Sequence, residues 1–193
     1  MASLVRCWET ADPAYIAYHD EEWGRPVADE HGVYERLCLE GFQSGLSWLT
    51  ILRKREAFRA AFAGFDPDRV AGFGERDVER LLGDASIVRH RGKIEAAITN
   101  ARATIGLREA TPLHELFWQY APAGHRPPST HVDWAASTPE SAALARALRG
   151  AGFRFVGPTT LYAAQQACGV VNDHLSDCWV REAVEAERLR FSD

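Results

Sequence analysis

The stretch RGAGFRFVGPTT, residues 149–160, joins two segments with helical hydrophobic spacing through a short turn that contains glycines. Pro158 has the fixed φ that suits the first turn of a helix, so a new helix is predicted to begin there. Gly157 brings bare backbone to that helix start. Two helices joined in this way offer backbone N–H groups to an anion such as a phosphate. An ordinary helix–helix turn has the same composition, so the stretch alone leaves both interpretations open.

Helix signals fill the chain on both sides of this turn. Apolar residues at helical spacing predict helices over residues 33–39, 46–62, 75–88, 90–106 and 158–169. Asp-Pro and Thr-Pro pairs, which suit an N-cap followed by the first helical position, begin at residues 12, 66, 111 and 138. Convincing alternation typical of strands is absent from the sequence, so it predicts an all-α fold with short turns.

The composition limits the class of protein. The 193 residues suit one domain, and 46% hydrophobic with 25% charged residues is close to the average of globular proteins. A net charge of −5 predicts no general attraction to nucleic acid, so such a role needs a local basic face. We see no signal peptide and no apolar run of the roughly 18 residues that span a membrane. Four scattered cysteines predict a reduced, cytoplasmic compartment, where Cys and His bind metal or catalyse.

Two half-sites for a metal ion stand near the two ends of the chain. His174 and Cys178 are four residues apart, on one helical face if a helix runs there. Cys7 and His19 flank a short predicted helix at the other end. A Cys2His2 set suits zinc in a closed tetrahedral site, which would tie the two ends together. The spacing matches no zinc-finger pattern, so two other interpretations remain open. The residues could be a buried cysteine with surface histidines, or a Cys/His catalytic pair.

The apolar run LCLEGFQSGLSWLTIL, residues 37–52, contains one charged residue, Glu40. A buried carboxylate without a partner is unfavourable, so such a residue usually has a cation, a set of donors or a function. The alternative is that Glu40 ends a helix and points into solvent.

Aromatic residues are concentrated in the first quarter of the chain, at Trp8, Tyr15, Tyr18, Trp23 and Trp48. Most such groups belong to a core. Rings around a buried anion also suit a flat cation, which stacks on the rings and donates hydrogen bonds to the carboxylate. Two basic runs, Arg53–Arg55 and Arg89 to Lys93, would give a positive groove together with the stretch 149–160, although charge runs are usually solvated.

Long strings of the sequence resemble the DNA-3-methyladenine glycosylase I family, in the same order and over most of the chain from Arg6 to Cys178. The matching strings are DPAYIAYHDEEWG, LCLEGFQSGLSWLTILRKRE, FDPDRVAGF, ASIVRHRGKIEAAITNARA and GFRFVGPTTLYAAQQACGVVNDH. The resemblance implies a helix-hairpin-helix DNA glycosylase fold with a structural zinc site that joins the N- and C-termini. It also implies release of 3-methyladenine from alkylated double-stranded DNA.

The resemblance also assigns roles to residues of this chain. Glu40 is the implied catalytic and base-recognition carboxylate, with Tyr15, Tyr18 and Trp48 as pocket aromatics. The implied zinc ligands are Cys7, His19, His174 and Cys178. The implied DNA-contacting hairpin consists of Phe153, Arg154, Phe155, Val156, Gly157 and Pro158. The family usually has one residue between the first cysteine and the next tryptophan, whereas RCW has none, so Trp8 is not assigned to the pocket.

Methylation at N3 gives adenine a positive charge, so the base leaves as a neutral molecule once it has been flipped out of the stack. Asp173 lies where related glycosylases have an Asp that directs water, and a structural role is the alternative. The only lysines are Lys54 and Lys93, outside the hairpin, which predicts a monofunctional hydrolase that leaves an abasic site. A catalytically silent, zinc-stabilised sensor of alkylated bases is the alternative function.

The expected organisation is a single helical glycosylase domain over residues 1–180, followed by a helical or disordered tail over 181–193. We expect a cytoplasmic monomer without membrane contact, which binds alkylated DNA and releases free 3-methyladenine.

Overall fold

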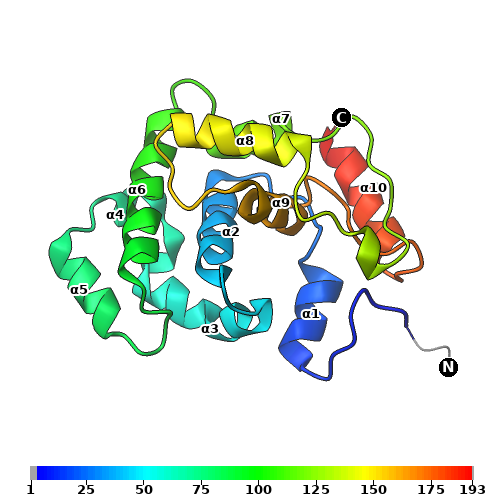
Figure 1. Cartoon of the computed structure of the whole chain (residues 1–193), viewed down its shortest axis with the longest axis horizontal. Coiled ribbons are helices and arrows are strands. Elements are labelled where there is room, and N and C mark those ends of the chain that lie inside the picture. The colour runs from blue at the N-terminus through cyan, green and yellow to red at the C-terminus, as the bar shows by residue number, and fades with distance from the viewer. Residues whose placement is uncertain (1–3, 193) are drawn as a thin grey trace.

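The computed structural model describes residues 4–192, and within that range every regular element is a helix (Figure 1). In chain order the elements are α1 (Pro13–Glu21), α2 (Glu30–Gln43), α3 (Trp48–Ala61), η1 (Ala63–Phe65), α4 (Pro67–Ala71), α5 (Glu75–Gly83), α6 (Arg91–Leu107), α7 (Leu113–Gln119), η2 (His131–Asp133), α8 (Pro139–Gly150), α9 (Pro158–Ala167) and α10 (Arg181–Ser192). The all-α prediction is therefore confirmed. None of the helices in the described range is long and apolar enough to cross a membrane.

Most of the predicted helix starts are correct because the capping chemistry is local. Side-chain oxygens of Asp12, Asp66 and Thr138 accept backbone N–H groups in the first turns of α1, α4 and α8. Pro112 is the exception, because it is itself the cap and α7 begins one residue later. The helix predicted over 75–88 ends at Gly83, since the Asp84 carboxylate accepts the backbone N–H and hydroxyl of Ser86 instead.

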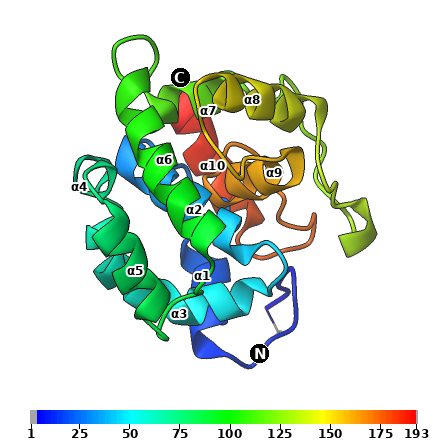
Figure 2. The ribbon, with the colours of Figure 1, turned by 60° about the vertical axis from the view of Figure 1, so that its left-hand side comes forward.

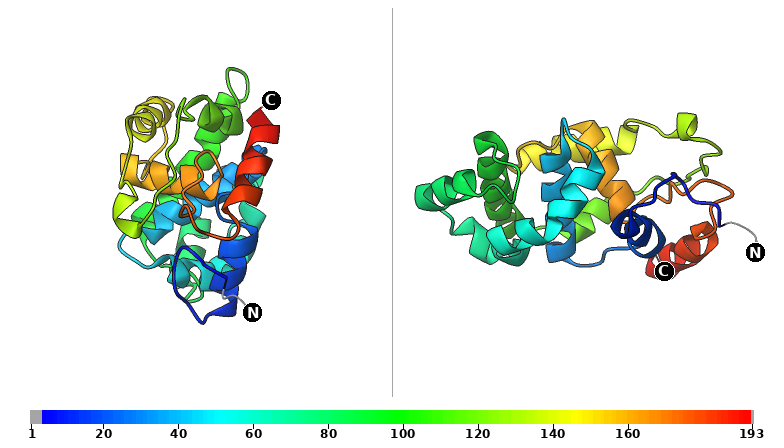
Figure 3. Two further views of the ribbon diagram at one scale, coloured as in Figure 1. Left: turned by 90° about the vertical axis from the view of Figure 1, so that its right-hand side faces the viewer. Right: turned by 90° about the horizontal axis from the view of Figure 1, so that it is seen from below.

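Helix α2 lies at the centre of the molecule, and α3, α6, α7 and α9 pack around it (Figures 1 and 2). Helix α4 packs on α6, and α8 packs on α9. Helices α1 and α10 lie at the same end of the molecule (Figures 1 and 3). The arrangement brings the first and last parts of the chain together.

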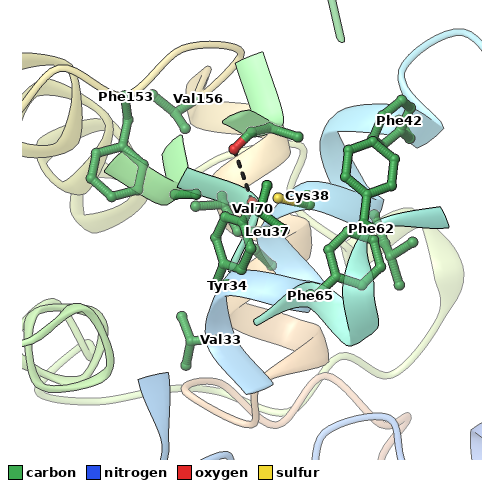
Figure 4. Close-up of a cluster of buried hydrophobic side chains, with 14 of the residues drawn as sticks. Val33, Tyr34, Leu37, Cys38, Phe42, Phe62, Phe65, Val70, Phe153 and Val156 are labelled. Atoms are coloured by element: carbon green, nitrogen blue, oxygen red, sulfur yellow. Dashed lines mark hydrogen bonds between the residues drawn. The ribbon is translucent and has the colours of Figure 1, made fainter. Parts of the chain in front are cut away.

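The main hydrophobic core lies against α2. Tyr34 is fully buried, and its hydroxyl donates a hydrogen bond of 2.9 Å to the carbonyl of Ala97 on α6, the dashed line in Figure 4. Phe62 stacks in the same core. Phe153 and Val156, from the turn between α8 and α9, are buried there too (Figure 4). The core therefore anchors this turn.

The turn between α8 and α9 is held on its other side by α6. Gly152 has φ +94°, a conformation that side chains rarely adopt, and Phe155 has φ +55°. The side-chain amide of Asn100 donates to the carbonyl of Arg154 at 3.0 Å and accepts from its N–H at 2.7 Å. The hairpin backbone is thus fixed relative to α6.

Residues 168–180 contain no helix, so the prediction that His174 and Cys178 share a helical face is wrong. Gly169 explains the change of course, because it has φ +72° and its backbone touches another segment. A Cβ at this position would lie 2.5 Å from the carbonyl carbon of Arg25. The chain becomes helical again at α10, where the side chain of Val184 is buried.

Candidate substrate pocket and metal centre

A cavity of about 230 Å³ lies where α1, α2, α3 and α9 meet. Its lining residues are Trp8, Tyr15, Tyr18, Trp23, Glu40, Gln43, Trp48, Trp134, Ala163 and Gln166. The structure thus brings together all four residues that the sequence predicted for the substrate, namely Tyr15, Tyr18, Glu40 and Trp48. Their roles stay a prediction at this point.

Aromatic rings form most of the cavity wall. Tyr15 stacks on Trp8, with ring centroids 4.9 Å apart and planes 30° apart. Tyr18 lies 5.2 Å from Trp48, and Trp8 lies 5.1 Å from Trp23. Such walls suit a flat aromatic ligand. Trp8 and Trp23 were not predicted as pocket residues, although their sequence positions beside Cys7 and His19 link them to the metal half-site.

Glu40 is buried in this cavity with 6% of its surface exposed, so the alternative in which it points into solvent is wrong. No residue between 4 and 192 forms a hydrogen bond or an ion pair with its carboxylate. Burial raises the pKa of Glu40 to about 8. Burial and the nearby Glu40 also raise the pKa of Tyr15 and of Tyr18.

Two indole donors in the cavity wall also lack partners. The Nε1 atoms of Trp8 and Trp48 are buried, and neither has a hydrogen-bond partner in the described part of the chain. Buried polar groups in folded proteins are nearly always hydrogen-bonded. A cavity lined by rings, two unpaired donors and an unpaired carboxylate has the features of a site that binds a flat polar ligand.

Asp173 lies behind this wall and is not one of the lining residues. Its Oδ2 accepts hydrogen bonds from the Tyr162 hydroxyl at 2.8 Å and from Nε2 of Gln166 at 2.6 Å. Nε2 of His125 lies 2.6 Å from Oδ1. Burial raises the pKa of Asp173, but these partners outweigh it and the net pKa is below its ordinary value. This arrangement favours the structural role for Asp173.

The four predicted metal ligands, far apart in sequence, converge in one buried cluster. The ligand atoms of Cys7, His19, His174 and Cys178 all lie within 4.8 Å of one another. Nδ1 of His174 is 3.3 Å from the sulfur of Cys7 and 3.4 Å from that of Cys178. Tetrahedral zinc, with bonds of about 2.3 Å to sulfur and 2.0–2.1 Å to nitrogen, sets such pairs about 3.5 Å apart. The donor set and its spacing therefore fit a closed metal site.

Outer partners orient both histidines toward the cluster. Nδ1 of His19 lies 2.7 Å from the Asp20 carboxylate, which leaves Nε2 facing the sulfurs. Nε2 of His174 lies 2.9 Å from the Trp23 carbonyl, which leaves Nδ1 facing them. Carboxylate and carbonyl partners of this kind fix the tautomer and orientation of metal-binding histidines. The surroundings are thus already arranged for a metal ion.

The metal centre and the cavity share a wall. The Trp8 ring lies 4.7 Å from the His19 ring, and the Trp23 ring lies 4.7 Å from the His174 ring. Both tryptophans line the cavity. The positions of these two cavity rings therefore depend on the positions of the cluster histidines that they contact.

The hairpin residues predicted to contact DNA divide into two groups. Phe153 and Val156 are buried in the core, so only their backbone is available to a ligand. Arg154 and Phe155 are exposed, and Phe155 is 47% exposed despite its size. Gly157 is the N-cap of α9 and makes no side-chain cap bond, so backbone N–H groups at that helix start are available.

Most cations of the two basic runs have partners within the protein. Arg53 pairs with Asp12, and Arg55 pairs with Glu22. Arg91 contacts three glutamates of α5 and α6. The ammonium group of Lys93 donates to two backbone carbonyls at the end of α2.

One exposed apolar residue beside the cavity was missed by sequence reasoning. Leu46 is 43% exposed in the loop of residues 44–47, between the lining residues Gln43 and Trp48. The helix predicted over residues 46–62 placed Leu46 at its start, whereas α3 begins at Trp48. Gly45, with φ +84°, marks the turn that moves Leu46 outward.

Comparison with known proteins agrees with this geometry. The model of the methyladenine glycosylase family matches residues 8–182. DNA-3-methyladenine glycosylase 1 of Escherichia coli is 49% identical over 181 residues, which cover 91% of this chain and 96% of that protein. DNA-3-methyladenine glycosylase of Haemophilus influenzae is 40% identical and covers 90% of this chain and 96% of its own length.

Solved structures show the same likeness. A crystal structure of 3-methyladenine DNA glycosylase I superposes with a TM-score of 0.87 at 47% identity, covering 91% of this chain and 98% of that one. The Staphylococcus aureus enzyme, studied for its recognition of 3-methyladenine, gives a TM-score of 0.85 at 34% identity, with 89% and 93% covered. On the extent of these matches, the chain belongs to the methyladenine glycosylase family.

Proposed function

We propose that this protein flips 3-methyladenine out of alkylated double-stranded DNA and hydrolyses its glycosidic bond. The observation that carries the proposal is Glu40, a buried carboxylate without a partner among the described residues, inside an aromatic cavity. Relatives named DNA-3-methyladenine glycosylase support the same activity. The structure of a related enzyme in complex with 3-methyladenine supports the same ligand.

The cavity can favour an alkylated base over a normal one through charge. Methylation at N3 gives the base a positive charge, which is attracted to the ring faces of Tyr15, Tyr18 and Trp48 and to the Glu40 carboxylate. Normal adenine is neutral and lacks this attraction. The cationic base shifts Glu40 toward its ionised form, so the unfavourable burial of the carboxylate is relieved when the ligand enters.

The same charge explains why little acid catalysis is needed. The cationic base leaves the sugar as a neutral molecule, so no proton has to be delivered to it. As the bond breaks, the sugar becomes oxocarbenium-like and water attacks its anomeric carbon. Glu40 holds the leaving base and adds negative charge close to the developing cation, which makes it the catalytic residue of the proposal.

DNA is held through the hairpin and the adjacent loop. The N-terminus of α9 presents the backbone N–H groups of Gly157, Thr159 and Thr160 to a phosphate, whereas Pro158 has none, and Arg154 adds an exposed cation. Leu46 is placed to fill the gap left by a flipped nucleotide, as apolar side chains do in other DNA complexes.

The Cys2His2 cluster would hold zinc through Cys7, His19, His174 and Cys178. A zinc ion bound by four protein ligands supplies structural order rather than reaction chemistry. In this chain that order reaches the cavity through Trp8 and Trp23, whose rings lie against the ligand histidines.

The contacts of both lysines support a monofunctional enzyme. The amine of Lys93 donates to the carbonyls of Phe42 and Ser44, and that of Lys54 donates to the carbonyls of Ala85 and Ser86. Neither lysine lines the cavity. We therefore expect an abasic site as the product, without a Schiff-base intermediate. A monomer located in the cytoplasm also stays part of the proposal.

The test is release of bases from methylated DNA, followed by chromatography of the soluble fraction. Free 3-methyladenine should accumulate far above the spontaneous rate. Binding without any release above that rate would instead support the catalytically silent sensor. Borohydride should trap no covalent enzyme–DNA adduct, and a trapped adduct would show that the enzyme is bifunctional.

A further inference from the structure

Gln166 lies on α9 and lines the cavity. A hydrogen bond to Asp173, which lies outside the cavity lining, fixes the orientation of its side-chain amide. We propose that Gln166 is a specificity-determining residue, which favours N3-methylated purines with an amino group at position 6 over those with a carbonyl group there. The inference deepens the proposed function and depends on it. It concerns the choice between two alkylated bases, which the charge of the base cannot make.

The orientation of the amide follows from its contact with Asp173. Nε2 of Gln166 donates to Oδ2 of Asp173 at 2.6 Å. A carboxylate accepts hydrogen bonds and has none to donate, so the NH2 group must face it. The opposite orientation would place two acceptor oxygens in contact. The carbonyl oxygen of Gln166 is consequently the end of the amide that remains for a ligand.

Asp173 is itself held rigidly in place. The Tyr162 hydroxyl donates to the same Oδ2 at 2.8 Å, and Nε2 of His125 lies 2.6 Å from Oδ1. The indole N–H of Trp134 donates to its backbone carbonyl at 2.9 Å. Asp173 is only 3% exposed, so it rarely exchanges these contacts for water. Gln166 therefore presents an acceptor of fixed direction.

A fixed acceptor distinguishes the two purines at position 6. Adenine carries an amino group there, with two N–H donors, whereas guanine carries a carbonyl acceptor. An amino group can donate to the carbonyl of Gln166. A guanine carbonyl would meet another acceptor with no donor between them, and sites built around a hydrogen bond discriminate strongly against partners that cannot form it.

The other carboxyl and amide groups of the cavity, those of Glu40 and Gln43, are not held by a buried partner within the described range. Burial raises the pKa of Glu40 to about 8, so before the ligand enters, both its donor form and its acceptor form are present near neutral pH. The Gln43 amide has no hydrogen-bond partner between residues 4 and 192, so it is free to turn either end to the ligand. Gln166 alone among these three is oriented by a buried partner.

The test compares the two bases on one substrate. DNA treated with a methylating agent contains both 3-methyladenine and 3-methylguanine, and chromatography measures the initial release rate of each. The wild-type protein should release 3-methyladenine much faster. Gln166→Met keeps the length of the side chain but removes the acceptor, and should lower the ratio of the two rates about tenfold.

Asp173→Asn should also lower this ratio, because an asparagine can donate to Gln166 and so allows its amide to turn. Gln165→Met is the matched control, since the neighbouring amide is buried, donates to the carbonyl of Tyr120 and does not line the cavity. It should leave the ratio unchanged. A purely structural role for Gln166 would lower both rates equally and also leave the ratio unchanged.

The outcomes separate this inference from the proposed function. If the wild-type protein releases neither base, the proposed function fails. If it releases 3-methyladenine but Gln166→Met, folded by circular dichroism, keeps the wild-type ratio, only the inference is overturned. Equal release of both bases by the wild-type protein overturns it without any variant, so the test does not depend on the stability of the substituted proteins.

Discussion

Glu40 combines an unfavourable burial with a proposed function, and both can be measured. Glu40→Gln keeps the size of the side chain and removes the charge that attracts the cationic base. We expect the rate of 3-methyladenine release to fall by about 100-fold or more, the loss typical of removing a key electrostatic contact in an active site. Excision at the wild-type rate by the folded variant would rule out the assignment of Glu40.

The same substitution should stabilise the protein at high pH. The pKa of Glu40 rises from 4.5 to about 8 on folding, so the folded state binds a proton more tightly than the unfolded state. The contribution of this proton binding to the free energy of unfolding is full below pH 4.5, declines as the pH rises and is lost above about pH 8. The free energy of unfolding changes by on the order of 5 kcal/mol over this range.

Glutamine does not titrate, so Glu40→Gln and the wild-type protein should differ little in stability at pH 5. At pH 9 the variant should be the more stable one. Denaturant unfolding at pH 5 and pH 9 measures the difference between the free energies of unfolding of the two proteins. The titration of all other groups affects both proteins equally, so it cancels in this difference. A difference that does not change with pH would show that the Glu40 carboxylate is solvated or paired.

A separate prediction concerns the Cys2His2 cluster and the loss of one of its cysteines. Cys178→Ser should abolish stoichiometric zinc binding and lower the melting temperature by roughly 10 °C or more, because metal binding contributes directly to folding. Cys168→Ala is the control, since this cysteine is equally buried but lies outside the cluster. It should keep the metal, as measured by elemental analysis. Full zinc content in Cys178→Ser would contradict the ligand set.

Sequence reasoning identified the residues with unusual chemistry and missed those that depend on the fold. A lone carboxylate in an apolar run and paired Cys and His residues stand out in one dimension, so Glu40 and the four predicted metal ligands were singled out, and the family resemblance then assigned their roles. Gln166 and Trp134 are ordinary residues in their local sequence. Only the packing of α9 on α2, and of the Trp134 ring against Trp8 and Trp23, places them at the cavity.

Helix α6 connects the two segments that are expected to contact DNA. Near its start, the ammonium group of Lys93 donates to the carbonyls of Phe42 and Ser44, which lead into the loop with Leu46. Two turns later, Asn100 holds the backbone of Arg154 in the hairpin. One rigid helix therefore sets the spacing between the loop and the hairpin.

Asn100→Ala should consequently weaken DNA binding about tenfold, because it removes two hydrogen bonds that fix the hairpin. Binding of free 3-methyladenine, measured by calorimetry, should stay unchanged, since Asn100 does not line the cavity. Thr99→Ala is the control, because this exposed neighbour bonds only within α6, to the Glu95 carbonyl. Equal losses for DNA and for the free base would indicate general destabilisation instead of a positioning role.

Helices were predicted well where their signals are local, and poorly where distant contacts decide the course of the chain. Asp12 and Thr138 cap α1 and α8 through neighbouring residues, so the sequence shows these starts. The irregular path of residues 168–180 follows from the contact of Gly169 with the backbone at Arg25, 144 positions earlier in the chain. No short sequence window contains both partners.

The charge of the whole molecule determines how it meets DNA. The net charge is −5, and nine arginines of the described residues pair with carboxylates. Within the hairpin segment 153–158 itself, Arg154 is the one cation, so in the proposed complex backbone N–H groups at α9 are expected to carry much of the phosphate contact. Affinity for DNA should therefore depend weakly on salt, with a slope of log K against log salt concentration near −2 or −3, corresponding to about two or three neutralised phosphates.

Arg154→Ala should reduce this slope by about 0.9, the contribution of one phosphate contact, because Arg154 is exposed on the hairpin and pairs with no carboxylate within residues 4–192. Arg108→Ala is the control of equal charge. Arg108 is bound to Glu30 and Asp68, at the opposite end of α2 from the cavity, so its loss should leave the slope unchanged. Equal changes for both variants would mean that net charge, and not the hairpin, governs binding.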